Sequence, residues 1–218
     1  MKVLVTGAHG LLGSTLVPYL CSRGYEVVSC FRTGGDVGAD LTDAAQVSAV
    51  LGQVAPDGIV NLAAKTSVDE CERRPQLAYL TKVRIVENLA KWMRESGGSC
   101  HMIQISTDQV YDGAGPHEEG DITLTNYYGF SKYAGELAVA TVSSTVLRTN
   151  FFGLSHCEKR QSLTDWIFRS LSRTDGESIQ VFDDVIFSPL SSNSKCNTTG
   201  LEGLRCCHAN EILSTHEC

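Results

Sequence analysis

The chain has 218 residues, of which 42% are hydrophobic and 20% charged, so it can bury one core of ordinary size and is not a disordered protein. Its formal net charge of −7 argues against nucleic acids and anionic membrane surfaces as partners. No run approaches the ~20 apolar residues that cross a bilayer, and the first residues lack the pattern of a signal peptide. We therefore expect a cytoplasmic protein with no membrane or nucleic-acid partner.

The nine cysteines are expected to be thiols, because nothing in the sequence indicates export. The cysteines and histidines after residue 200 follow no spacing typical of a zinc site, so no metal is predicted. Five cysteines lie in apolar or helical stretches and are interpreted as small core residues: Cys21, Cys30, Cys71, Cys100 and Cys157.

Apolar runs alternate with helical patterns along the chain. Strands are predicted at Lys2–Thr6, Glu26–Phe31, Gly58–Leu62, His101–Ser106 and Thr145–Arg148. Helices are predicted at Leu11–Arg23, Ala44–Val54, Gln76–Ser96 and Gly129–Val142. This alternation is typical of parallel βαβ units, and strands without polar alternation indicate helices on both faces of the sheet. We therefore expect an α/β fold with a doubly wound parallel sheet of the Rossmann type.

A glycine-rich turn follows the first predicted strand. Gly7, Gly10 and Gly13 form a G-x-x-G-x-x-G pattern at the mouth of the first predicted helix. Glycines there permit a tight turn and let the backbone approach a pyrophosphate, which the free N–H groups of the helix can bind. The pattern predicts a dinucleotide site, although the same glycines also suit a purely structural turn.

The end of the second predicted strand indicates which dinucleotide is bound. An acidic residue there would accept a hydrogen bond from a ribose 2′-hydroxyl, whereas this chain has Arg32, whose guanidinium suits a 2′-phosphate. We therefore predict NADPH as the cofactor, with NADH as the alternative. Asp40 and Leu41 are expected beside the adenine, with the leucine against its face.

Tyr128 and Lys132 are four residues apart in a predicted helix, so their side chains share one face. A cation beside a tyrosine favours the phenolate and lowers the pKa of the phenol from about 10. The tyrosine can then pass a proton to a carbonyl oxygen as hydride arrives on the carbon. Thr107 follows the strand His101–Ser106, at the edge where parallel sheets bind ligands, and is predicted to hold the substrate carbonyl.

Longer motifs give the chain a resemblance to a known family over residues 1 to about 190. The motifs are 5–13 (VTGAHGLLG), 40–43 (DLTD), 60–64 (VNLAA), 106–113 (STDQVYDG), 128–136 (YGFSKYAGE) and 147–150 (LRTN). With them the chain resembles the extended short-chain dehydrogenase/reductases. Within these it is most similar to the dTDP-4-dehydrorhamnose reductases and their sugar-nucleotide-binding relatives.

The resemblance implies a role for each matching residue and a reaction, in which NADPH reduces the 4-keto group of a nucleotide-linked deoxysugar. Thr107, Tyr128 and Lys132 correspond to the catalytic hydroxyl, the proton donor and the lysine that also holds the nicotinamide ribose. The cofactor residues are Gly7, Gly10, Leu11, Leu12, Gly13, Arg32, Asp40, Leu41, Ala63, Ala64, Thr66, Tyr128 and Lys132. The substrate residues are Val68, Asp69, Thr107, Asn150 and Phe151.

Two positions depart from the family pattern. Lys65 stands where these reductases commonly have an aromatic residue, and the run 150–153 (NFFG) lacks the tryptophan that flanks the sugar in many of them. Phe151 is therefore either an apolar wall of the sugar site or a core residue. Asp69 is either a substrate contact or an acidic residue in the first turn of a helix.

The chain divides into two parts of different character. Residues 1–150 are predicted to form the cofactor-binding core, and residues 151–218 the remainder of the core with part of a substrate-binding lobe. Periodicity is lost after Leu190, so residues 191–218 are atypical. We therefore expect an incomplete substrate lobe at a truncated or altered carboxyl-terminal end.

Three interpretations of function remain open from the sequence. The first is the reductase, as a monomer or a homodimer. The second is a non-catalytic dinucleotide-binding regulatory subunit, because relatives of these reductases serve methionine adenosyltransferase in that role. The third is a fragment without activity. The intact Tyr128–Lys132 pair favours the enzyme, whereas the altered end and the changed sugar-flanking positions favour the regulatory subunit.

Overall fold

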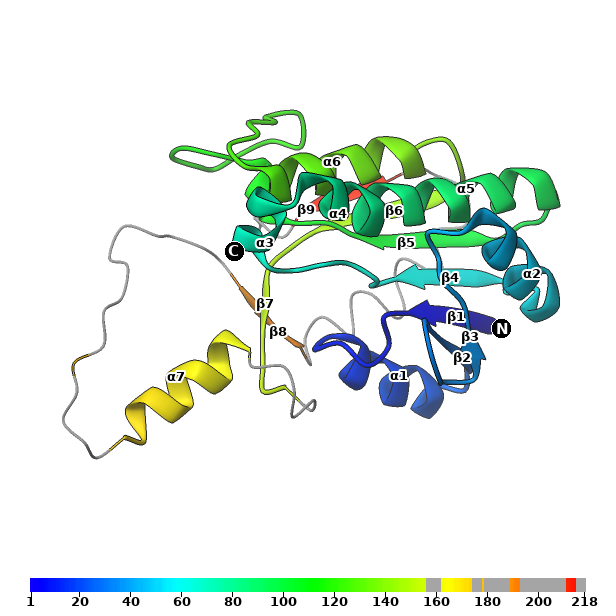
Figure 1. Ribbon diagram of the computed structural model, residues 1–218, viewed down its shortest axis with the longest axis horizontal. Coiled ribbons are helices and arrows are strands. Elements are labelled where there is room, and N and C mark those ends of the chain that lie inside the picture. Colours follow the sequence, from blue (N-terminus) through cyan, green and yellow to red (C-terminus); the bar gives the residue numbers. More distant parts are fainter. Residues whose placement is uncertain (156–161, 174–177, 179–188, 193–210, 215–218) are drawn as a thin grey trace.

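The structure is a computed structural model that describes residues 1–155, 162–173, 178, 189–192 and 211–214. Within these residues the centre of the molecule is a seven-stranded sheet in the order β3-β2-β1-β4-β5-β6-β9, and every pairing in it is parallel (Figure 1). The strands are β1 Lys2–Thr6, β2 Glu26–Phe31, β3 Val37–Gly38, β4 Gly58–Asn61, β5 His101–Ile105, β6 Ser144–Arg148 and β9 Glu211–Ser214.

Helices connect the strands, and a second, two-stranded sheet lies beyond the end of β6. The helices are α1 Gly13–Ser22, α2 Ala44–Val54, α3 Val68–Arg73, α4 Pro75–Tyr79, α5 Ile85–Ser96, α6 Tyr127–Val139 and α7 Leu163–Leu171, with a π-helical turn η1 at Leu80–Arg84 and a 3₁₀ turn η2 at Asp108–Val110. The small sheet pairs β7 Phe151–Phe152 with β8 Leu190–Ser191 in parallel.

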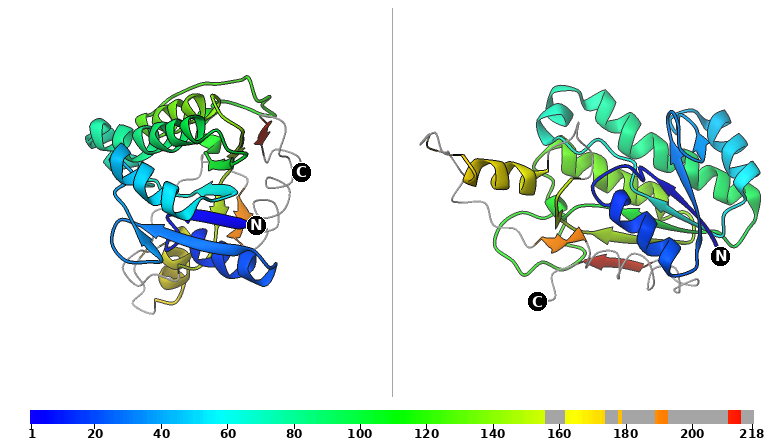
Figure 2. Two further views of the ribbon diagram at one scale, coloured as in Figure 1. Left: turned by 90° about the vertical axis from the view of Figure 1, so that its right-hand side faces the viewer. Right: turned by 90° about the horizontal axis from the view of Figure 1, so that it is seen from below.

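The two faces of the large sheet are buried by different helices (Figure 2). On one face α2, α5 and α6 pack side chains such as Leu51, Leu89 and Val139 against the sheet. On the other face α1 packs Leu16 and Leu20 against it. The Rossmann-type doubly wound α/β fold expected from the sequence is therefore confirmed.

The predicted strands and helices are present, but the structure differs from the prediction in two ways. The single helix expected over Gln76–Ser96 is divided by the π turn η1, and the elements β3, η2, β7, α7, β8 and β9 were not predicted. Cys21 was expected in the core but is exposed, because α1 turns that side away from the sheet, whereas Cys30, Cys71 and Cys100 are buried free thiols. Cys157 lies outside the described residues.

Helix α7 has no buried residue, although its amino terminus is well formed. Ser162 and Asp165 make a reciprocal capping box there, each side chain accepting a hydrogen bond from the backbone of the other residue. Its apolar side chains are exposed, with Phe168 at 67% and Leu171 at 78%. In the described part of the chain no helix, α7 included, is long and apolar enough to cross a membrane.

The sheet has a switch point at β1, where the strand order changes direction (Figure 1). Strands β2 and β3 lie on one side of β1, and β4, β5 and β6 lie on the other. In open parallel sheets a ligand binds beyond the carboxyl ends of the strands at such a point. The glycine turn between β1 and α1 lies at this edge.

A buried chain of polar side chains crosses the carboxyl ends of the three central strands. The Thr6 hydroxyl on β1 donates to the side-chain oxygen Oδ1 of Asn61 on β4 at 2.6 Å, and the side-chain Nδ2 of Asn61 donates to Oε1 of Gln104 on β5 at 2.7 Å. The Thr6 hydroxyl also accepts hydrogen bonds from the backbone N–H groups of Leu62 and Ala63, both at 3.2 Å. These bonds satisfy the polar groups that burial would otherwise leave unpaired and fix the loop after β4 beside the glycine turn.

Gly13 is where the glycine turn and α1 come closest together. A methyl group at Gly13 would lie 2.5 Å from the Cα and the carbonyl oxygen of Ala8, which are backbone atoms that cannot rotate away. We therefore expect Gly13→Ala to lower the free energy of unfolding by about 1–3 kcal/mol, measured by urea denaturation. Gly52→Ala in α2 is the matched control, since a methyl group at Gly52 would have no atom within 4 Å. It should raise stability by about 0.5–1 kcal/mol, and equal effects of the two changes would contradict this account of the turn.

Candidate active site

A cavity of about 220 Å³ opens at the carboxyl ends of β1, β4, β5 and β6. Its wall combines the glycine turn, the loop after β4, the end of β5, the start of α6 and the segment after β6. The lining residues are Gly7, Gly10, Leu12, Gly13, Leu62, Ala64, Thr66, Ile105, Ser106, Thr107, Gln109, Tyr128, Lys132, Thr149, Asn150 and Phe151.

The glycine turn fits a pyrophosphate. Gly7 has a φ of +65°, and a methyl group there would lie 2.8 Å from the carbonyl carbon of Leu62. Gly10 closes the turn by donating from its N–H to the carbonyl of Gly7 at 2.8 Å. The backbone is thus open on the cavity side, and the amino terminus of α1 adds N–H groups and a partial positive charge.

Three polar side chains expected to act together do share this cavity. Thr107 is the second residue after β5, and Tyr128 and Lys132 stand one turn apart at the start of α6. That start is fixed by Asn126, whose side chain accepts a hydrogen bond from the N–H of Gly129 at 2.7 Å. Thr107 and Tyr128 both line the cavity, and the threonine hydroxyl is near enough to lower the pKa of the phenol.

Lys132 is buried, and its ammonium donates to the carbonyl oxygen of Ile105 at 2.6 Å. Burial lowers the pKa of Lys132 to about 8, the positive charge of Lys82 lowers it as well, and the carboxylate of Glu136 opposes both. The lysine therefore carries its charge at neutral pH but is close to losing it.

Tyr128 does not have the lowered pKa expected from its neighbour Lys132. Burial raises the pKa of the Tyr128 phenol to about 12, the hydrogen bond with Thr107 opposes this, and the acidic groups Asp108 and Cys71 raise it further. The expectation is wrong, because burial dominates and the Lys132 ammonium donates to the carbonyl oxygen of Ile105. At neutral pH the phenol thus holds a proton.

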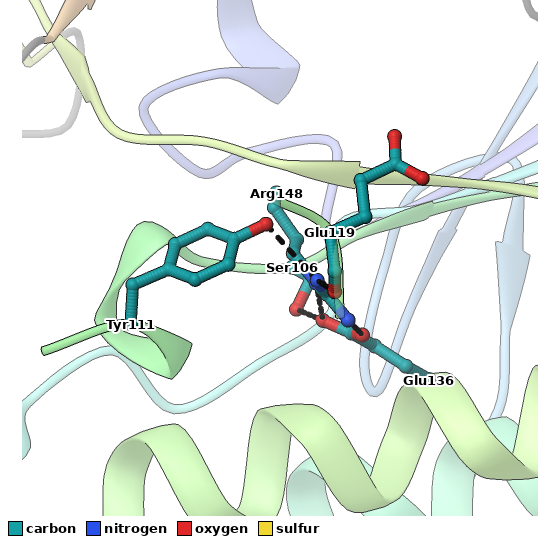
Figure 3. Close-up of polar contacts among 5 residues, drawn as sticks. All are labelled: Ser106, Tyr111, Glu119, Glu136 and Arg148. Atoms are coloured by element: carbon teal, nitrogen blue, oxygen red, sulfur yellow. Dashed lines mark hydrogen bonds and ion pairs between the residues drawn. The ribbon is translucent and has the colours of Figure 1, made fainter. Parts of the chain in front are cut away.

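A buried ion pair behind the cavity fixes α6 to the ends of β5 and β6 (Figure 3). Arg148 at the end of β6 donates to the Glu136 carboxylate from Nη2 at 2.6 Å and from Nε at 3.0 Å, and both side chains are almost completely buried. Arg148 also donates to the Tyr111 hydroxyl at 3.0 Å and to the carbonyl of Glu119 at 2.5 Å. Ser106, next to Thr107, donates to the same carboxylate. The network sets the position of the helix that carries Tyr128 and Lys132.

The predicted cofactor residues fall into three groups. Most line the cavity, whereas Arg32, Asp40 and Leu41 lie beyond it near the end of β2 and the start of α2. Leu11 and Ala63 are next to lining residues but are not themselves part of the wall. The ones that line it are Gly7, Gly10, Leu12, Gly13, Ala64, Thr66, Tyr128 and Lys132.

Arg32 and Asp40 form a pair at the edge of the sheet. The Nε of Arg32 lies 3.6 Å from a carboxylate oxygen of Asp40, and the arginine side chain is 69% exposed. Hydrogen bonds from Thr42 lower the pKa of Asp40, so its carboxylate is charged and compensates the guanidinium. Leu41 is only 7% exposed and packs into the core. Little of its side chain is therefore open to an adenine.

The predicted substrate residues are also divided. Thr107, Asn150 and Phe151 line the cavity, whereas Val68 and Asp69 lie in the first turn of α3 and do not. The expected helix start is present, because Ser67 caps α3 by accepting from the N–H of Glu70 at 3.2 Å.

Lys65, which departs from the family pattern, forms a 2.9 Å ion pair with Glu70. This contact holds its ammonium toward α3.

Sequence reasoning missed several residues of the wall and one buried lysine beside it. Ser106 begins the 106–113 motif and Thr149 follows the last predicted strand, so strand-end position was an available signal for both. Lys82 lies four residues from both Ala78 and Val86, which are buried, so helical spacing places it on the inward, apolar face of the predicted helix. A charged residue on that face could have been recognised in the sequence as unusual.

In the part of the chain that the structure describes, no group of three or more acidic, histidine or cysteine side chains is placed to hold a metal ion.

The sheet, the glycine turn and the Thr107–Tyr128–Lys132 set define an extended short-chain dehydrogenase/reductase. The family model described as RmlD substrate binding domain matches residues 1–198. The chain belongs to this RmlD family.

Curated relatives and solved structures agree with that assignment. The probable low-salt glycan biosynthesis reductase Agl14 of Haloferax volcanii is 31% identical over 212 residues, which cover 91% of this chain and 69% of that protein. A dTDP-4-dehydrorhamnose reductase of Streptomyces griseus is 40% identical, covering 64% of this chain and 45% of the relative. The crystal structure of the Bacillus anthracis dTDP-4-dehydrorhamnose reductase in complex with NADP is 27% identical, covers 98% of this chain and 74% of its own, and superposes with a TM-score of 0.81.

Most of the curated relatives are longer than the matched region. The chain spans between 42% and 53% of the length of seven of them. One of these is the methionine adenosyltransferase 2 subunit beta of Xenopus tropicalis, which is 34% identical over 142 residues, covering 63% of this chain and 42% of that protein. Because the chain spans only about half the length of these relatives, their activities and partners enter here only as the basis of a proposal.

Proposed function

We propose that the chain is an NADPH-dependent reductase of the 4-keto group of a nucleotide-linked deoxysugar, of the dTDP-4-dehydrorhamnose reductase type. The observation that carries the proposal is the single cavity that joins the glycine turn to Thr107, Tyr128 and Lys132. Relatives named as dTDP-sugar reductases, and a homologous structure that contains NADP, support it. The free thiols of Cys30, Cys71 and Cys100 support a cytoplasmic location.

The three polar side chains take different roles in this reaction. Thr107 donates a hydrogen bond to the substrate carbonyl and holds it beside the phenol. Tyr128, protonated at neutral pH, transfers its proton to the carbonyl oxygen as that oxygen becomes negative. The charge of Lys132 favours the phenolate that remains, so proton transfer becomes easier once the carbonyl is being reduced.

The cofactor supplies the hydride when it is bound. Gly7, Gly10 and Gly13 would hold its pyrophosphate, and Lys132 the nicotinamide ribose. We assign cofactor binding to residues 1–150 and the sugar to the side of the cavity formed by Asn150 and Phe151, where residues 151–218 begin.

The reductase is tested by following NADPH absorbance with the purified chain and dTDP-4-dehydrorhamnose as substrate. Consumption of NADPH that requires both the sugar nucleotide and the chain is the expected result. Saturable NADPH binding without turnover, together with stoichiometric co-purification of a synthetase, would instead favour the regulatory subunit. Size-exclusion chromatography of the same sample reports whether the chain forms a homodimer.

Arg32 is the residue on which the preference for NADPH rests. Its exposed guanidinium lies beside the end of β2, where the 2′-substituent of the adenosine ribose is expected. We expect Arg32→Ala to weaken NADPH binding about 10- to 100-fold and to leave NADH binding nearly unchanged, because a charge-assisted hydrogen bond to the phosphate is lost. Calorimetric titration with both cofactors measures the change.

Arg94→Ala is the matched control for Arg32. Arg94 also has its side chain near the surface, where it donates to Thr141 at 2.6 Å, but it stands in the last turn of α5 toward the amino ends of the strands. It should leave both affinities unchanged. Equal loss of NADPH and NADH affinity in Arg32→Ala would mean that this residue does not read the phosphate.

A further inference from the structure

Lys82 is a buried lysine that the proposed reaction does not use. It lies in the π turn η1 and is only 2% exposed, although lysines are almost never fully buried unless they are paired. Its ammonium donates to the Cys71 thiol at 2.8 Å and to the Ser131 hydroxyl at 3.2 Å. Among the ion pairs of the described residues none joins Lys82 to a carboxylate. Burying the Lys82 ammonium without a carboxylate partner costs free energy, and the packing of its side chain alone does not account for its presence here.

The charge lies directly against the proposed proton donor. The Lys82 nitrogen is 4.0 Å from the centre of the Tyr128 ring, within the distance of a cation–π contact. Close packing of α6 on η1 brings them together, because Gly135 allows the α6 backbone to approach. A methyl group at Gly135 would lie 2.8 Å from the Lys82 carbonyl oxygen. The π turn thus presents Lys82 to the first turns of α6.

We propose that Lys82 is a positioning residue of the site, whose buried ammonium holds the ring of Tyr128 and sets the protonation of the Tyr128–Lys132 pair. The inference rests on the proposed function, because only in the proposed reductase do Tyr128 and Lys132 act as a catalytic pair. Lys82 lines no part of the cavity wall and acts through the two side chains that do.

The titratable groups that act on Lys82, Tyr128 and Lys132 come from α3, η2 and α6. Helix α3 contributes the Cys71 thiol, and η2 contributes the carboxylate of Asp108, which acts on Tyr128. Helix α6 contributes Tyr128 itself and Glu136, whose carboxylate is already engaged by Arg148 of β6. Glu136 is the one group among these that favours a charged Lys132.

The direction of the effect follows from the sign of the charge. A cation beside a phenol favours the phenolate, and a cation beside another ammonium favours its neutral form. Lys82 lowers the pKa of Lys132, and by the same reasoning its contact with the Tyr128 ring favours the phenolate. Removing the charge should raise the pKa of both groups.

The test compares Lys82→Met with the wild-type chain, because methionine retains the length of the side chain without its charge. Lysine side chains are labelled with ¹³C, and the Lys132 resonance, assigned by its loss in Lys132→Met, is followed through an alkaline titration. We expect the wild-type midpoint near the value of about 8, and an upward shift of about one pH unit in Lys82→Met. Lys82→Arg, which keeps a charge, should return the midpoint toward the wild-type value.

Lys91→Met is the matched control, since Lys91 lies on the exposed side of α5 and faces Glu95 at 3.8 Å. It should leave the midpoint unchanged. If Lys82→Met does not fold, Cys71→Ala, which removes a partner of Lys82 and retains its charge, provides the second measurement and should also move the Lys132 midpoint. If Lys82→Met folds and its Lys132 midpoint is unchanged, the inference is overturned. If Lys82→Met does not fold, an unchanged Lys132 midpoint in Cys71→Ala overturns it.

The titration uses the chain alone, so it is independent of the proposed reaction. If Lys132 shifts as expected but the wild-type chain reduces no sugar nucleotide, the electrostatic role of Lys82 stands and the proposed function fails. If the wild-type chain is active, Lys82→Met should lower kcat and leave the Kd for NADPH within about twofold, because Lys82 lies behind Tyr128 and not in the cavity wall.

Discussion

Tyr128→Phe is expected to lower the turnover of a 4-keto sugar nucleotide by about 10²- to 10⁴-fold, because it removes the proton that the reduced carbonyl oxygen must receive. The ring remains, so the contact with the Lys82 ammonium and the packing of α6 are retained. NADPH binding should change little, since the glycine turn is untouched. Steady-state rates and fluorescence titration with NADPH separate the two effects.

Tyr127→Phe is the matched control for this prediction. Tyr127 is the preceding residue of the same helix and is 49% exposed, and its hydroxyl is outside the cavity. Its loss should leave turnover within about twofold of wild type. Full activity in Tyr128→Phe would remove the phenol from the mechanism.

Glu136→Ala is expected to lower the free energy of unfolding by about 3–5 kcal/mol, since it leaves the buried Arg148 guanidinium without its carboxylate. The same change removes the acceptor of the Ser106 hydroxyl, next to Thr107. Urea denaturation followed by circular dichroism measures the loss. Residual folded protein should also show weakened NADPH binding, because α6 loses its attachment to β5 and β6.

An exposed ion pair gives the comparison for Glu136. Glu95 faces Lys91 across one turn of α5 at 3.8 Å, and more than half of each side chain is exposed. Glu95→Ala should cost no more than about 0.5 kcal/mol, as is typical of pairs that water screens. Losses of similar size at Glu95 and Glu136 would mean that burial does not determine the contribution of the Arg148 pair.

The order of the elements and the position of the site were predictable because each depends on local signals. Short apolar runs in the sequence predict the strands β1, β4 and β5, and the spacing of the glycines predicts the first turn. Tyr128 and Lys132 share a face because helical spacing alone requires it. The parallel sheet then brings Thr107 to the same edge as the glycine turn.

The features that were not predicted depend on contacts between distant segments. The π turn at Leu80–Arg84 lies where α6 packs closely on this helix at Gly135, a contact between residues more than fifty positions apart. The pKa of Tyr128 is raised by burial and by Asp108 and Cys71, groups that are distant from it in the sequence, and not set by its helical neighbour Lys132. The Cys21 thiol is exposed although the pattern around it is apolar, since periodicity alone did not decide which face of α1 meets the sheet.

The most direct test of the proposed reductase is transfer of deuterium from NADPH labelled at nicotinamide carbon 4 to a 4-keto sugar nucleotide by the purified chain. The proposal predicts that the product alcohol carries the deuterium at sugar carbon 4, and that Tyr128→Phe forms little of it while still binding NADPH. A chain that binds NADPH saturably and leaves the sugar nucleotide unlabelled and unreduced would contradict the proposed reductase.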